Sequence, residues 1–190
     1  MTETKFFKSV RERRLWIWTL LVLAAILSTL GLGSVLASIR VPQSVAAVFF
    51  VLGMLLVAVT VLTQGLRTRP GGFEVGIAIG ISAVYLMFFL RLTIPERSHL
   101  IEFGVLSVFI YEALKERKGS GGRVPLPFLL AIVIASLVGV IDESAQIFIP
   151  DRVFDPVDIL FNFLASTMAV SSVALLNWAR SLRSGSETQS

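Results

Sequence analysis

The stretch that decides the fold is 124–149, VPLPFLLAIVIASLVGVIDESAQIFI. It carries no charge from Val124 to Ile141, and Asp142, Glu143 and Gln146 then follow in its last turns. A helix needs roughly 20 apolar residues to cross the hydrocarbon core of a bilayer. The stretch therefore predicts a membrane-spanning helix that ends in polar side chains.

The composition of the whole chain agrees with this interpretation. Of its 190 residues, 55% are hydrophobic and 16% are charged, and the mean hydropathy is +0.81. Soluble domains are about 45–50% apolar and about 25% charged. The high hydrophobicity excludes a disordered chain. The absence of cysteine excludes a disulfide scaffold, thiolate catalysis and cysteine-based metal sites.

Further apolar runs of similar length flank this stretch. Together they predict an all-α transmembrane bundle of about six spans, at 15–39, 41–66, 73–90, 98–114, 124–149 and 156–179. We divide the chain into an N-terminal two-helix membrane segment (1–72), a four-helix transmembrane domain (73–180) and a disordered cytoplasmic tail (181–190). The first run is longer than the roughly 7–15 apolar residues of a signal peptide, so we expect an uncleaved anchor.

The basic residues predict the orientation of these spans. If the loops alternate between two sides, only four of the 17 lysines and arginines fall on one of them: Arg40, Arg91, Arg97 and Arg152. Because cytoplasmic loops carry the excess of basic residues, we expect both termini in the cytoplasm. The net charge of +4 then serves topology, and we expect no nucleic-acid partner.

Polar residues interrupt three spans at one common depth. On the predicted topology, the spans at 98–114 and 156–179 begin at the outer face and the span at 124–149 ends there. Their polar residues fall within roughly 10 Å of that face. Ionisable groups inside spans are costly and usually face a bundle interior or a water-filled cavity. The candidate polar site therefore comprises His99, Glu102, Glu143, Gln146, Arg152, Asp158 and Asn162, with Asp142, Arg97 and Asp155 as secondary members.

Some of these residues also have a purely structural interpretation. Asp155-Pro156-Val157-Asp158 is typical of a helix start, so Asp158 alternatively serves only as a cap. Asp142 and Glu143 point about 100° apart. We expect Glu143 to face the common centre and Asp142 to face a neighbouring helix or the headgroups. A separate stripe at 72, 76 and 80 consists of glycines and predicts close helix packing.

The polar residues carry a family resemblance. His99-x-x-x-Phe103-x-x-Leu106, Asp142-Glu143-x-x-Gln146, Pro150-x-Arg152 and Asp155-x-x-Asp158-x-x-x-Asn162 resemble the VanZ-like family of bacterial membrane proteins. The family often has a lysine three residues before the histidine, where this chain has glutamate at position 96. The resemblance implies a polytopic plasma-membrane protein related to one associated with resistance to teicoplanin.

Three functions are compatible with this pattern. The first is an outer-leaflet pocket that binds a lipid-linked envelope precursor, a lipoglycopeptide or another amphiphile, with Arg152 and His99 holding anionic groups. The second is an intramembrane enzyme acting on a lipid or peptidoglycan precursor, with His99 as a general base held by Glu102. The third is a proton-coupled transporter. We expect membrane lipids as partners, no cofactor and no metal, since one histidine and no cysteine disfavour zinc.

Overall fold

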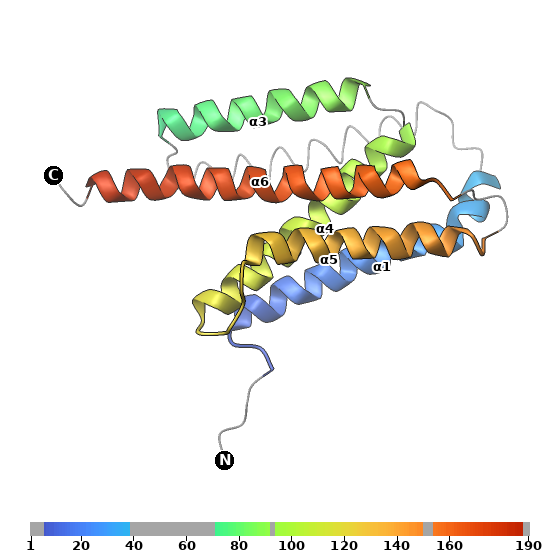
Figure 1. Cartoon of the computed structure of the whole chain (residues 1–190), viewed down its shortest axis with the longest axis horizontal. Helices are drawn as coiled ribbons and strands as arrows, with labels where there is room; N and C mark the ends of the chain where they lie inside the picture. The colour runs from blue at the N-terminus through green and yellow to red at the C-terminus, as the bar shows by residue number, and fades with distance from the viewer. Residues whose placement is uncertain (1–5, 39–70, 92–93, 150–153, 188–190) are drawn as a thin grey trace, which may run out of the picture.

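The chain is helical throughout the part that can be described (Figure 1). The computed structural model describes residues 6–38, 71–91, 94–149 and 154–187. These contain α1 (Val10–Ser38), α3 (Gly72–Arg91), α4 (Ile94–Gly119), α5 (Pro127–Gln146) and α6 (Pro156–Glu187). The all-α prediction is thus confirmed for the described residues, whereas the predicted span at 41–66 lies outside them.

Helix α4 lies at the centre of the bundle, where it packs against α6, α1 and α5. Helix α6 packs in addition against α5 and α3. Figure 1 shows that α5 ends where α4 and α6 begin, at the same end of the bundle. We call this the α5–α6 end, and it is the end at which the polar residues of the three predicted spans fall.

The core of the bundle combines large side chains of α4 with small ones of its neighbours. Phe103, Leu106 and Ile110 of α4 are fully buried. They meet buried alanines such as Ala131 on α5 and Ala165 on α6. Small residues let helix backbones approach closely, which is the usual packing device where surrounding lipid removes the hydrophobic driving force.

Apolar side chains also cover the outer surface of the bundle. Large hydrophobic residues are exposed along α1, α3, α5 and α6. Among the described residues, two helices are long and apolar enough to cross a membrane, α5 and the part of α6 from Pro156 to Leu182. Length, composition and exposed surface together favour a membrane protein.

A glycine turn reverses the chain between α4 and α5. Gly121 adopts φ +83°, which L-residues with a side chain rarely adopt. The amide of Gly122 donates to the carbonyl of Arg117 at 2.9 Å, and that of Gly121 donates to the carbonyl of Lys118 at 3.2 Å. This pattern is a Schellman motif, which satisfies the last carbonyls of α4. Pro127 then opens α5, where a missing amide hydrogen costs nothing.

Ion pairs join α1 to α4 at the opposite end of the bundle. The buried carboxylate of Glu12 lies 3.4 Å from Arg117, and Arg11 lies 3.4 Å from Glu112. Ser9 accepts a hydrogen bond from the Glu12 amide at 2.9 Å and donates one to Glu116 at 2.8 Å. These contacts fix the start of α1 against the end of α4.

The structure differs from the sequence expectation in two places. Helix α6 continues to Glu187, through most of the segment at 181–190 that the sequence assigns to a disordered tail. Extending an existing helix needs no new nucleus, so a span readily continues beyond the membrane boundary. The glycine stripe of α3 is also not packed closely against any described residue, because a Cβ atom added at Gly72, Gly76 or Gly80 would meet nothing within 4 Å.

Candidate functional site

The α5–α6 end brings together polar residues from α4, α5 and α6. His99 lies in the first turns of α4, Glu143 and Gln146 lie in the last turns of α5, and Asp158 and Asn162 lie in the first turns of α6. Each helix therefore contributes its polar turns to the same end of the bundle (Figure 1). The contacts described next connect them.

Glu143 fastens the end of α5 to the start of α6. Its side chain is fully buried. One carboxylate oxygen, Oε1, accepts a hydrogen bond from the backbone amide of Asp155 at 2.7 Å. The other, Oε2, accepts one from Nε2 of Gln146 at 3.0 Å. The bond from Asp155 joins the end of α5 to the start of α6, and the bond from Gln146 holds the carboxyl group in place on α5.

His99 pairs with a carboxylate on another helix. Its Nε2 atom lies 3.7 Å from Oδ2 of Asp158, which joins α4 to α6. The imidazole ring also stacks on Phe103, with 6.1 Å between ring centroids. Nδ1 of His99 is buried and has no hydrogen-bond partner in the ranges that the structure describes. The sequence analysis expected Glu102 to hold His99. Glu102 is half-buried and lies one turn further along α4.

Asp155 is the helix cap that its sequence pattern predicts. Its Oδ1 atom accepts a hydrogen bond from the amide of Val157 at 2.8 Å, in the first turn of α6. Such a side chain satisfies one of the otherwise unpaired amides of a helix N-terminus. The carboxylate of Asp158 instead lies beside His99.

Asn162 lies one turn after Asp158 on α6, further from the α5–α6 end. Its side chain is fully buried, and neither Oδ1 nor Nδ2 has a hydrogen-bond partner among the described residues. It packs against α5 at Gly139, where an added Cβ atom would stand 3.0 Å from Nδ2. A buried amide without partners is rare in proteins, because its desolvation then goes uncompensated.

Two buried serines that the sequence interpretation missed lie near Asn162, further from the α5–α6 end. Ser166 donates to the carbonyl of Asn162 at 2.8 Å. Ser107 on α4 donates to the carbonyl of Gly104 at 2.9 Å and lies 3.5 Å from the carbonyl of Ser166. Serines in apolar helices commonly bond the carbonyl one turn back, so the sequence contains no signal that sets these two apart.

Asp142 and Glu143 were expected to point apart, with Glu143 at the common centre and Asp142 at a neighbouring helix or among headgroups. Both side chains are buried, which for Asp142 agrees with a place next to a neighbouring helix and not among headgroups. Helix α5 packs against α4, α6 and α1, so more than one of its faces is covered. Arg97 lies in α4 with its side chain outside the described part, and Arg152 lies outside the described residues altogether.

The described part of the chain contains no preformed metal site. No three histidine or acidic side chains come together there in a way that could hold an ion. The described partners of Glu143 are hydrogen-bond donors, and that of Asp158 is His99. The geometry therefore suits hydrogen bonding and charge pairing.

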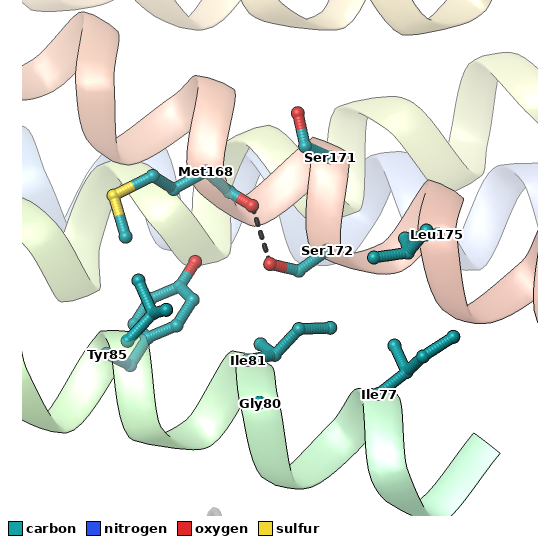
Figure 2. Close-up of a pocket in the computed structure, with 9 residues that line it drawn as sticks. Ile77, Gly80, Ile81, Tyr85, Met168, Ser171, Ser172 and Leu175 are labelled. Atoms are coloured by element: carbon teal, nitrogen blue, oxygen red, sulfur yellow. Dashed lines mark hydrogen bonds between the residues drawn. The ribbon is translucent and has the colours of Figure 1, made fainter. Parts of the chain in front are cut away.

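A separate cavity lies between α3 and α6. It has a volume of about 520 Å³, and Figure 2 shows Ile77, Gly80, Ile81 and Tyr85 of α3 facing Met168, Ser172 and Leu175 of α6. Ser172 donates its hydroxyl hydrogen to the carbonyl of Met168 at 2.7 Å. Most of the lining is aliphatic, so this cavity lacks the charged groups of the α5–α6 end.

Comparison with known proteins finds no relative. No family model, no curated protein and no solved structure matches this chain. The resemblance to VanZ-like proteins therefore stays a prediction that depends on the motif residues.

Proposed function

We propose that this chain is a six-span protein of the bacterial plasma membrane, with both termini in the cytoplasm and the α5–α6 end facing outward. The observation that carries this proposal is the burial pattern in the last turns of α5. Ile141 is 63% exposed, whereas Glu143 is 0% exposed. In water, this pattern would cost free energy twice, because an apolar side chain would be exposed to solvent and a carboxylate would be removed from it. In lipid, it is the favourable arrangement.

Labelling of single cysteines tests the topology, because the natural chain has none. Phe148→Cys is placed after α5 and Ser120→Cys is placed before it, and both positions are exposed. In intact spheroplasts, a membrane-impermeant maleimide is expected to label Phe148→Cys only, and both variants after lysis. Labelling of Ser120→Cys alone in intact cells would reverse the orientation, and equal labelling of both would refute a span between them.

The polar cluster at the α5–α6 end serves, on this proposal, as the binding site for a lipid-linked or amphiphilic ligand. The support is that His99 and Asp158 are partly exposed, whereas Glu143 and Asn162 at the same end are sealed from solvent. A ligand anchored in the outer leaflet reaches such a site laterally. By the resemblance to VanZ-like proteins, the ligand class includes lipoglycopeptides, and the protein contributes to resistance against them.

Susceptibility to teicoplanin tests this role. We expect Glu143→Gln to lose protection in a host that expresses the chain. Glu74→Gln is the matched control, since Glu74 is also a buried carboxylate but pairs with Arg180 at the opposite end of the bundle. Unchanged susceptibility in Glu143→Gln at normal expression would refute the resistance role.

A second candidate function is an intramembrane enzyme acting on a lipid or peptidoglycan precursor. The observation that favours it is the His99–Asp158 pair, because a carboxylate that orients an imidazole is the usual setting of a general base. Incubation with labelled undecaprenyl-linked substrates tests it. Turnover that is lost in His99→Gln supports the enzyme, and no turnover of any substrate argues for binding alone.

A further inference from the structure

The candidate site is rich in negative charge. The described part contributes the carboxylates of Glu102, Asp142, Glu143, Asp155 and Asp158, against the single imidazole of His99. The side chains of Arg97 and Arg152 lie outside the described part of the chain, so the balance among the described side chains at this end is five carboxylates against one imidazole. An anionic group brought to this end of the bundle would meet net repulsion in a medium of low dielectric constant.

Asn162 supplies an independent observation. Its side chain is sealed from solvent, and within the described part of the chain both its donor and its acceptor are without a partner. It follows Asp158 by four residues on α6, so the two side chains share one face about 6 Å apart along the helix axis. It also packs against Gly139, which lies one turn before Glu143 on α5. An acceptor and a donor without partners are thus held directly beneath the acidic residues.

We propose that this site binds the protonated amine of an amphiphile that carries a hydroxyl group on the neighbouring carbon. The carboxylate of Asp158 pairs with the ammonium group, since its side chain is 24% exposed and reachable from the bundle end. Oδ1 of Asn162 accepts a hydrogen bond from the same ammonium group. Nδ2 of Asn162 donates to the hydroxyl oxygen, so both orphaned atoms gain partners.

The other residues of the site support this binding mode without contacting the ligand. Glu143 already accepts hydrogen bonds at both oxygens, from Asp155 and Gln146, and therefore holds the helix ends in place. His99 orients Asp158 from α4. The proposal rests on the proposed function, because it assigns a headgroup chemistry to the same site.

Amphiphiles of equal chain length test the assignment. The purified full chain in neutral maltoside micelles is titrated with 2-amino-1-dodecanol, dodecan-1-ol and dodecyl phosphate, and the thermal unfolding midpoint and the apparent Kd are measured. We expect the amino alcohol to bind at least tenfold more tightly than either of the others. A preference for the phosphate, or equal binding of all three, would overturn the assignment.

Variants locate the site. Asp158→Asn is expected to weaken binding of the amino alcohol at least tenfold. The natural chain is expected to bind 2-amino-1-dodecanol more tightly than dodecylamine, which lacks the hydroxyl group, and Asn162→Leu is expected to remove this difference. Glu74→Gln, at the opposite end, is expected to bind as the natural chain does. Unchanged binding in Asp158→Asn would overturn the proposal even if the Asn162 variant fails to fold.

These results separate the proposal from the function on which it rests. If the phosphate binds best and Glu143→Gln loses protection against teicoplanin, the amine assignment fails and the ligand-binding function stands. If no amphiphile binds and Glu143→Gln retains protection, both fail.

Discussion

Asn162 on α6 lies so close to Gly139 on α5 that a Cβ atom added to the glycine would stand 2.9 Å from the Cβ atom of the asparagine. Real Cβ atoms do not approach at this distance, and the atom in the way belongs to the root of the side chain. The two helices therefore approach closely at Gly139, because this residue of α5 has no side chain.

The first prediction concerns this contact. Gly139→Ala is expected to lower the free energy of unfolding by about 1–3 kcal/mol, the usual cost of overpacking. The measurement is the thermal unfolding midpoint in detergent. A midpoint equal to or above that of the natural chain would contradict the close approach of α5 and α6.

The second prediction concerns the glycine stripe of α3. Gly76→Ala is expected to raise the unfolding midpoint, because the new methyl group meets nothing within 4 Å and alanine is favoured over glycine by about 1 kcal/mol in a helix. Gly139→Ala serves as the opposite case. A lower midpoint for Gly76→Ala would show that the stripe packs against a part of the chain outside the described residues.

The third prediction concerns the ion pairs between α1 and α4. Arg117→Ala leaves the buried carboxylate of Glu12 without its cation. Breaking a buried pair costs about 3–5 kcal/mol, and the lower end applies because Arg117 is 34% exposed. Arg11→Ala is expected to cost less than about 1 kcal/mol, since Arg11 is 67% exposed. Equal losses in the two variants, measured by denaturant unfolding, would refute this difference.

The fourth prediction concerns the tie made by Glu143. Glu143→Gln keeps one oxygen for the Asp155 amide, and its NH₂ group bonds Gln146 only if the Gln146 amide rotates to present Oε1, so two bonds to a carboxyl group become bonds of a neutral amide. Glu143→Leu loses both and leaves the Asp155 amide without this acceptor. The unfolding midpoint is therefore expected to fall in the order natural chain, Gln variant, Leu variant. A Leu variant as stable as the natural chain would show that the tie adds nothing to stability.

Local patterns predicted much of this fold from the sequence. Hydrophobic runs gave helices close to α1, α3, α5 and α6, and Asp155-Pro156 gave the start of α6, because each depends on neighbours in the chain. The polar turns of α4, α5 and α6 fall at one end for the same reason. Successive helices run in opposite directions, so residues near the start of α4, the end of α5 and the start of α6 reach the same end of the bundle.

Contacts between helices were harder to predict. The pairing of His99 with Asp158, and of Glu12 with Arg117, depends on which faces of the helices meet, and no local pattern specifies that. The burial of Asp142 has the same origin, because α5 is covered on more than one side. The pattern Ser9-x-x-Glu12 was a readable signal of a helix start, and it would have placed the first residue of α1.

The bond between Ser9 and Glu116 joins residues 107 positions apart, whereas that between Asp155 and Glu143 joins residues 12 positions apart. At a synthesis rate of about 5–20 residues per second, the short-range tie forms within seconds of translation, but α1 waits about 5–20 s for its partner on α4. During that interval Glu12 has no Arg117 beside it. The nascent chain must therefore keep its first helix in a setting that tolerates a carboxylate without Arg117, and this places a time constraint on its folding.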